Sequence, residues 1–201
     1  VYYNFLDGYY FFDVDNYCNK IYDYPHEVGE IDKYDLQHHM IGGNIATKTY
    51  IGNSFILTSG INYSNFNRRH IGYWNIDDSQ LWNNKGYKND LNVFVNGNYT
   101  YRNFTINGNI QYRHADFDYI GDVNFDKINW DFLNWGINLK YQIKNKHYFY
   151  ASVTQTHREP TRSDMFGGNE NFSELVTKQA ESVIDYEIGY NLNIDKFNFN
   201  I

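Results

Sequence analysis

The sequence predicts an all-β fold, an antiparallel transmembrane β-barrel with short periplasmic turns and long extracellular loops. Three observations carry this prediction. Apolar and polar residues alternate along many segments, and the connections between these segments are alternately short and long. There is also no run of about 18 apolar residues that would form a transmembrane helix. A barrel crosses the membrane with segments of about ten alternating residues, so each strand gives only a weak signal.

The clearest segment is a hairpin over residues 88–114. Its arms carry aliphatic and aromatic residues on one parity and mainly Asn, Gln and Thr on the other. Successive side chains of a strand point to opposite faces, so each arm has one apolar and one polar face. The few residues around Tyr101–Asn103 make the two arms antiparallel. We expect the apolar face, with Ile137 on a later strand, to meet lipid and the amide-rich face, with Asn138, to meet a wet interior.

Similar segments follow one another along the chain. Strands are expected over residues 1–12, 36–49, 54–65, the two arms of 88–114, 131–143, 147–157, 182–194 and from 197. Short turns are expected near residues 50, 102, 145 and 195, and long loops over 13–34, 66–87, 115–129 and 158–180. This segregation of loop lengths is typical of outer-membrane barrels, whereas a soluble sandwich gives no reason for it. No motif recurs with the similar spacing of the turns, which argues against propeller blades.

Aromatic residues make up 20% of the chain. Several gather near the short turns, where an interfacial aromatic girdle would lie. They are Tyr99, Tyr101, Phe104, Tyr141 and Tyr190. The plainer alternative is that Tyr and Phe are simply good strand formers.

Composition excludes several classes of protein. The formal charge is −7, with 17 Lys and Arg against 24 Asp and Glu, so no nucleic-acid partner is expected. Cys18 is the only cysteine, which rules out an intrachain disulfide and the Cys/His spacings of zinc sites. The rings of the adjacent His38 and His39 diverge on a strand, so we expect no metal there. No nucleophile stands at a telling spacing from a His and an acid, so we expect no enzyme, no catalytic residue and no cofactor.

The two ends of the sequence suggest a piece of a longer protein. The chain starts at Val1 without a signal peptide, and it stops at Ile201 inside an alternating run. We therefore interpret residues 1–201 as one partial barrel domain.

A stretch near the C-terminal end resembles a known family. A strand reading YASV at residues 150–153 leads into HREPTRSD at 157–164, and Glu181 and then DYEIGY at 185–190 follow after a loop. This order resembles the C-terminal barrel region of TonB-dependent outer-membrane receptors, in which a strand like YASV…REP.R.D precedes a loop and then PE…YELGY. Gln179-Ala180 stands where a Lys-Pro often precedes the Glu, which is a small departure.

Further segments are similar to Bacteroidetes-type members of this family. They are Asp35–Asn44, Trp82–Asp90 and Gln111–His114. The resemblance implies a 22-stranded barrel, to which this chain would supply about eight or nine strands. It also implies an N-terminal plug domain and a TonB box, neither of which lies in these residues. The expected location is the outer membrane of a Gram-negative bacterium.

Residues of the long loops are the candidates for ligand contact. Arg pairs well with carboxylate or phosphate, and Trp can stack on a ring or a sugar. The candidates are Arg68, Arg69, His70, Trp74, Trp82, His114, Asp116, Arg158 and Arg162. The alternative is that these are solvated loop residues or that they contact lipopolysaccharide phosphates.

The residues that carry the family resemblance are predicted to have a structural role. We expect the charged ones among them to form a network that holds the loop base or touches the plug, since partly buried charges are paired. The motif comprises Arg158, Glu159, Pro160, Arg162, Asp164, Glu181, Glu187, Gly189 and Tyr190.

The resulting functional hypothesis is TonB-coupled import of a scarce ligand such as a siderophore, haem, cobalamin or glycan. The expected partners are outer-membrane lipid and lipopolysaccharide, the TonB complex through the missing plug, and a surface lipoprotein. Two alternatives stay open at this point: a passive porin-like channel and a soluble β-rich binding protein.

Overall fold

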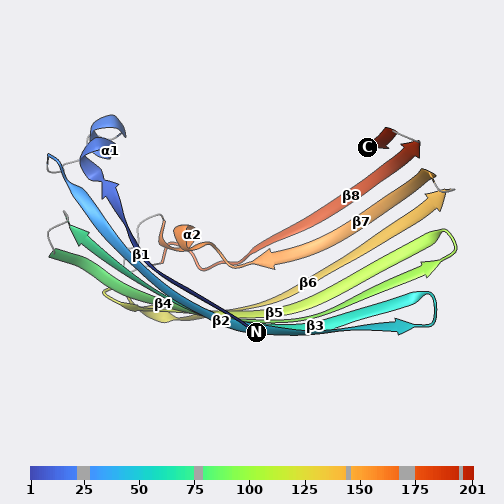
Figure 1. Cartoon of the computed structure of the whole chain (residues 1–201), viewed down its shortest axis with the longest axis horizontal. Coiled ribbons are helices and arrows are strands. Elements are labelled where there is room, and N and C mark those ends of the chain that lie inside the picture. The colour runs from blue at the N-terminus through green and yellow to red at the C-terminus, as the bar shows by residue number, and fades with distance from the viewer. Residues whose placement is uncertain (22–27, 75–78, 144–145, 168–174, 195–196) are drawn as a thin grey trace.

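The computed structural model is a single antiparallel sheet of nine strands that lie side by side in chain order (Figure 1). It describes residues 1–21, 28–74, 79–143, 146–167, 175–194 and 197–201. The strands are β1 (Tyr2–Asp13), β2 (Ile31–Ile51), β3 (Phe55–Trp74), β4 (Ser79–Tyr101), β5 (Phe104–Gly121), β6 (Phe125–Ile143), β7 (His147–Arg158), β8 (Glu181–Ile194) and β9 (Phe197–Asn200). Two short helices are α1 (Val14–Ile21) and α2 (Arg162–Phe166). The predicted all-β class and antiparallel strand order are confirmed.

The sheet curves into an open trough with a concave inner face and a convex outer face (Figure 1). The strand ends that are joined by short turns lie together at one end of the trough, and α1 lies at the other. The helix α2 lies over the inner face. The unclosed sheet is consistent with part of a barrel wall. Within the described residues, neither helix is long and apolar enough to cross a membrane.

Side chains divide between the two faces as the alternation predicts. Val93 lies opposite Ile61 and Tyr112 on the neighbouring strands, and these apolar side chains share the outer face. Asn96 lies opposite Asn109 and, like it, is on the inner face, where Asn96 Oδ1 accepts from Asn107 Nδ2 at 3.1 Å. On β4 and β5 the inner face at this level is built mainly from uncharged amides and hydroxyls.

The outer face carries a continuous apolar band. On β4 to β6 it includes the exposed side chains Val93, Val95, Tyr99, Tyr101, Phe104, Ile106, Ile110, Tyr112, Leu133, Ile137, Leu139 and Tyr141. The band takes about 9–11 residues of each strand, which is the length that a tilted strand needs to cross the hydrocarbon core. Aromatic rings border it at the short turns. There the ring of Phe104 lies 4.5 Å from that of Tyr141, and the ring of Phe149 lies 4.8 Å from that of Tyr190.

Above this band the outer face becomes polar while the strands continue. Asp116 Oδ1 on β5 pairs with Lys127 Nζ on β6 at 2.9 Å and accepts from Asn89 Nδ2 at 3.0 Å. His114 Nδ1 lies 2.8 Å from Asp131 Oδ1. These pairs mark the level at which the strands leave the lipid on the side away from the short turns, because charged side chains are costly within the hydrocarbon.

The predicted bounds of the long loops were therefore too wide. β3 and β4 occupy most of residues 66–87, and β5 and β6 occupy most of 115–129. Within 13–34 the structure has α1 and the start of β2, and within 158–180 it has α2. The alternation fades in these places because outward side chains become polar outside the lipid. Backbone pairing does not need an apolar face, so the ladders continue.

Eight candidate ligand residues consequently lie on strands and not on loops, which corrects their predicted placement. They are Arg68, Arg69, His70, Trp74, Trp82, His114, Asp116 and Arg158.

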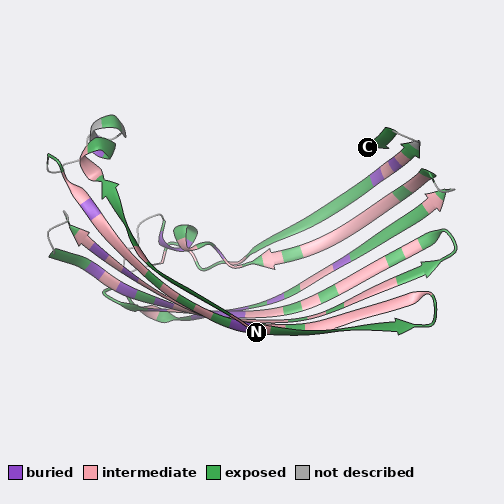
Figure 2. Cartoon of the chain, viewed as in Figure 1, coloured by how far each residue is buried: buried purple, intermediate pink, exposed green. Residues whose placement is uncertain are grey.

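Buried side chains concentrate in the half of the sheet that lies away from the short turns (Figure 2). The buried apolar cluster comprises Ala115, Tyr119, Val123, Ile128, Trp130, Phe132, Met165 and Phe166. It joins the β5–β6 hairpin to α2. The apolar core thus lies between the inner face and a segment folded back onto it.

Candidate functional site

Residues 159–166, here called the strap, turn inward after β7. Pro160 lacks an amide hydrogen and so cannot continue the ladder. Thr161 then caps α2: its side chain accepts from the Asp164 amide, and the Asp164 carboxylate accepts from the Thr161 amide at 3.0 Å. The hydroxyl and the amide of Thr161 both donate hydrogen bonds to the Asp164 carboxylate and thereby lower the pKa of Asp164. Gly167 ends the helix in the left-handed conformation, with φ of 59°.

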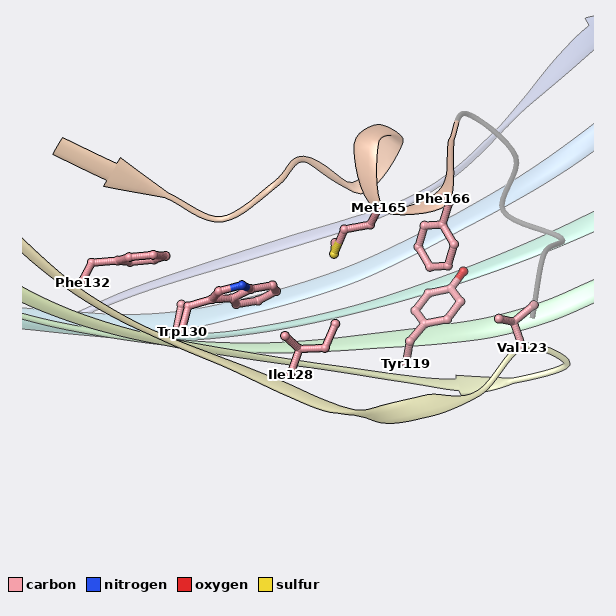
Figure 3. Close-up of a cluster of buried hydrophobic side chains, with 8 residues drawn as sticks. Tyr119, Val123, Ile128, Trp130, Phe132, Met165 and Phe166 are labelled. Atoms are coloured by element: carbon pink, nitrogen blue, oxygen red, sulfur yellow. The ribbon is translucent and has the colours of Figure 1, made fainter. Parts of the chain in front are cut away.

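Two apolar side chains anchor the strap to the wall. Met165 and Phe166 are 4% and 0% exposed and point from α2 toward the strands (Figure 3). The ring centroid of Phe166 lies 5.1 Å from that of Tyr119 on β5. Trp130 on β6 lies beneath the strap, and its Nε1 donates to the carbonyl of Lys178 at 2.9 Å. This packing fixes the strap over the upper part of the inner face.

Charged side chains anchor the beginning of the strap. Arg113 Nη1 donates to Glu159 Oε2 at 2.7 Å, and Arg113 Nη2 donates to Glu159 Oε1 at 2.9 Å. Lys88 Nζ on β4 also pairs with Glu159. On its other side Arg113 contacts Asp90 through Nε at 2.9 Å. Their side chains are 14–32% exposed, so the pairs are largely shielded from water.

We expect this network to lose its stabilising effect in acid. Burial raises the pKa of Glu159, but hydrogen bonds from Arg113 and Lys88 outweigh that effect. The net result is a pKa lowered from 4.5 to about 2. A carboxylate whose pKa falls on folding stabilises above its ordinary pKa, and that contribution disappears as the pH falls from about 4.5 to about 2. The full receptor should therefore melt at a higher temperature than its Glu159→Gln variant at neutral pH. The two should melt alike at a pH of about 2, and a gap that persists there would contradict this prediction.

A cavity of about 380 Å³ lies between the strap and the inner face. It is lined by Phe66, Arg68, His70, Asn84, Gly86, Lys88, Arg113, Phe117, Tyr119, Trp130, Arg158, Glu159, Pro160, Thr161, Arg162 and Met165. Among these described residues there are five Arg or Lys and one acid, in a chain whose formal charge is −7. The cavity therefore combines cations with aromatic rings.

Strand register explains how the floor of the cavity is built. Phe66, Lys88 and Phe117 lie directly opposite one another on β3, β4 and β5. The next row toward the polar end consists of Arg68, Gly86 and Tyr119. An added Cβ at Gly86 would lie 3.3 Å from Phe117 and 3.4 Å from Tyr119, so the two rings pack closely against the glycine.

Comparison with known families identifies the barrel. The family model described as "TonB dependent receptor-like, beta-barrel" matches residues 1–201. The chain belongs to this TonB-dependent receptor family. Such barrels lie in the outer membrane of Gram-negative bacteria, so the apolar band of this receptor segment faces outer-membrane lipid. The strand ends above the band, with the cavity, lie on the extracellular side, because the short turns of these barrels are periplasmic.

Solved structures of transporters share the fold of this receptor segment. The unliganded ferric citrate transporter FecA matches with a TM-score of 0.62 at 12% identity, over 81% of this chain and 26% of that one. The copper transporter OprC matches with a TM-score of 0.68 at 12% identity, over 82% of this chain and 28% of that one. The FrpB iron transporter from Neisseria meningitidis (F3-3 variant) matches with a TM-score of 0.61 at 17% identity, over 85% of this chain and 30% of that one.

The chain spans less than a third of the length of these three transporters. No curated protein matches its sequence. The narrower resemblance to Bacteroidetes-type receptors stays a prediction.

The structure brings four of the nine candidate ligand residues of this receptor segment together. Arg68, His70, Arg158 and Arg162 line the cavity. Arg162 extends from α2 across the cavity, where its Nη1 lies 2.9 Å from His70 Nδ1 and its Nη2 donates to the Tyr119 hydroxyl at 2.8 Å.

The other five candidates do not line the cavity. Arg69, His114 and Asp116 have the parity of the outer face, where Arg69 Nε donates to Asn83 Oδ1 at 3.0 Å. Trp74 Nε1 donates to Glu30 at 2.9 Å near the strand ends. Trp82 is buried on the inner face, and its ring lies over Gly72.

The residues of the sequence motif serve several separate contacts. Arg158 Nη2 pairs with Glu181 at 2.6 Å across β7 and β8, in an exposed ion pair. The Tyr150 hydroxyl donates to Glu187 at 3.0 Å, and the Tyr150 ring lies over Gly189, so close that an added Cβ would be 2.2 Å from it. Tyr190 is on the outer face, where its hydroxyl lies 2.6 Å from His147 Nδ1.

Sequence reasoning missed Lys88 and Arg113, which line the cavity, and Asp90, which pairs with Arg113. All three are on the polar parity of the hairpin, and they are charges on a face that otherwise carries mainly amides. That contrast is the signal that could have found them. Of the described residues, no three His, Cys, Asp or Glu side chains converge as a metal site would require. His38 and His39 hydrogen-bond to Asn4 and Tyr3 of β1, respectively, on opposite faces of the sheet.

Proposed function

We propose that the full receptor carrying this barrel segment imports a scarce small ligand across the outer membrane with energy from the TonB complex. The ligand would be a siderophore, haem, cobalamin or glycan, and the plug domain would carry the contact with TonB. Membership of the TonB-dependent receptor family supports this mechanism. The transport functions named for the structural neighbours, of ferric citrate, copper and iron, are consistent with it.

We further propose that the cavity under the strap contacts the ligand. The observation that carries this proposal is its position: it lies on the inner face, above the apolar band, and polar and aromatic groups line it together. Binding sites are typically concave and mostly apolar, with a few placed polar groups. Lipopolysaccharide would surround the outer face at the same level, and a surface lipoprotein would meet the strand ends.

Filling the floor tests the role of the cavity. We expect Gly86→Leu to reduce receptor-dependent uptake by about tenfold or more, because the new side chain occupies the ligand's space. The measurement is growth and uptake with a panel of ferric siderophores, haemin, cobalamin and oligosaccharides. Gly108→Leu is the matched control, since Gly108 has outer-face parity on β5 and nothing lies within 4 Å of an added Cβ.

Two results would contradict the proposed function. Equal uptake by the Gly86→Leu and Gly108→Leu variants would show that the ligand does not pass through the cavity. Uptake that persists in a host lacking TonB would make the barrel a passive channel.

A further inference from the structure

We propose that Glu159 is a resident counter-ion that holds the place of a ligand carboxylate, so that the cavity binds an aromatic carboxylate by exchange at Lys88 and Arg113. This inference rests on the proposed function and names the class of ligand for the same cavity. It concerns a side chain of the strap and two cations of the wall.

The first argument is the geometry at Arg113. Its guanidinium holds two carboxylates, Asp90 and Glu159. Asp90 belongs to β4 and is fixed by the strand ladder, whereas Glu159 comes from the strap. The Glu159 carboxylate receives two parallel N–H donors and an ammonium, which is the arrangement that would bind a free carboxylate.

The second argument is the apolar surface next to that carboxylate. Lys88 lies between the rings of Phe66 and Phe117, its direct neighbours on β3 and β5, and all three line the cavity. Beyond Lys88 the strand continues to Gly86, which also lines the cavity and is flanked by the rings of Phe117 and Tyr119. A carboxylate at the Lys88 ammonium would therefore place an attached ring in the cavity among aromatic side chains.

The third argument is the balance of charges. An incoming carboxylate replaces the two Arg113 hydrogen bonds and the Lys88 ion pair that Glu159 gives up, so no cation is left unpaired in a shielded site. The released Glu159 side chain has to move to solvent from a position where it is 14% exposed. Met165 and Phe166 keep the strap anchored meanwhile, because they are buried away from this exchange. A neutral ligand of the same shape would lack the ion pairs with the two cations.

The experiment compares two probes of one shape, 2-naphthoate and the neutral 2-naphthamide, on the purified full receptor by equilibrium dialysis. We expect wild type to prefer naphthoate, and Glu159→Gln to bind it about tenfold more tightly, because the competing charge is gone. Affinity for naphthamide should not change. Asp131→Asn is the matched control, since it removes a carboxylate from the outer face, and it should alter neither affinity.

Lys88→Gln provides an independent variant should Glu159→Gln not assemble. It should weaken the binding of naphthoate and leave the affinity for naphthamide unchanged. The exchange is overturned if Glu159→Gln binds naphthoate no more tightly than wild type. It is also overturned if either variant changes the affinities for both probes alike. If the exchange is overturned in either way but Gly86→Leu still abolishes binding of the probes, the cavity remains the ligand site. Only the counter-ion role of Glu159 then fails. If wild type binds neither probe, the exchange is rejected, while the uptake assays judge the proposed function separately.

Discussion

Replacing Ile137 by Arg is expected to destabilise the receptor by about 2–4 kcal/mol, the cost of a cation near the middle of the bilayer. Ile137 is 47% exposed on the outer face, and it lies within the apolar stretch of β6 from Leu133 to Tyr141. Its neighbours in register are Gly108 and Val153, neither of which offers a partner for the charge. The measurement is the free energy of unfolding in urea of the full receptor refolded into lipid vesicles.

The adjacent residue provides the control for this change. Asn138 lies opposite Asn107 and Ser152 on the inner face, so an Arg there would extend into a polar environment. Asn138→Arg should therefore cost much less than Ile137→Arg. Equal costs at the two positions would contradict the assignment of the faces.

Removing Arg113 is expected to be nearly as damaging, although it lies outside the lipid band. Arg113→Met keeps the length of the side chain but leaves Asp90 and Glu159 facing one another, with Lys88 as the remaining cation. Breaking a buried ion pair from one side typically costs 3–5 kcal/mol, and we expect about 3 kcal/mol here because these side chains retain some exposure. The melting temperature of the full receptor in detergent measures the loss.

Arg158→Met is the matched control for Arg113→Met. Arg158 also pairs with a glutamate, but the side chains of Arg158 and Glu181 are 63% and 47% exposed. Water already solvates both charges, so the pair stabilises little and its loss should scarcely change the melting temperature. A comparable fall in both variants would show that shielding does not set the strength of these pairs.

The part of the fold that follows from alternation could be predicted from the sequence. Val93 and Ile137 alternate with Asn96 and Asn138 because lipid and interior impose opposite demands on neighbouring residues. This demand ends where a strand leaves the membrane. Alternation consequently located the lipid-facing part of each strand and could not locate the strand's end.

The candidate site was harder to predict, because it depends on contacts distant in sequence. Lys88 and Glu159 are 71 residues apart, and Arg113 and Glu159 are 46 apart. Their meeting requires the strap to fold inward, which no periodic pattern encodes. Asp116 was expected near the ligand because residues 115–129 were interpreted as a loop, and His114 because it stands directly before that segment. Continuing the strand parity through them would have placed them on the face opposite Arg113.

The packing of the strap has a consequence for building chimeric receptors. Met165 and Phe166 meet side chains of the β5–β6 hairpin, among them Tyr119 and Trp130. A strap transplanted alone into another barrel would bring two large apolar groups to a surface not shaped for them. The strap and the upper β5–β6 hairpin should therefore be exchanged together as one module.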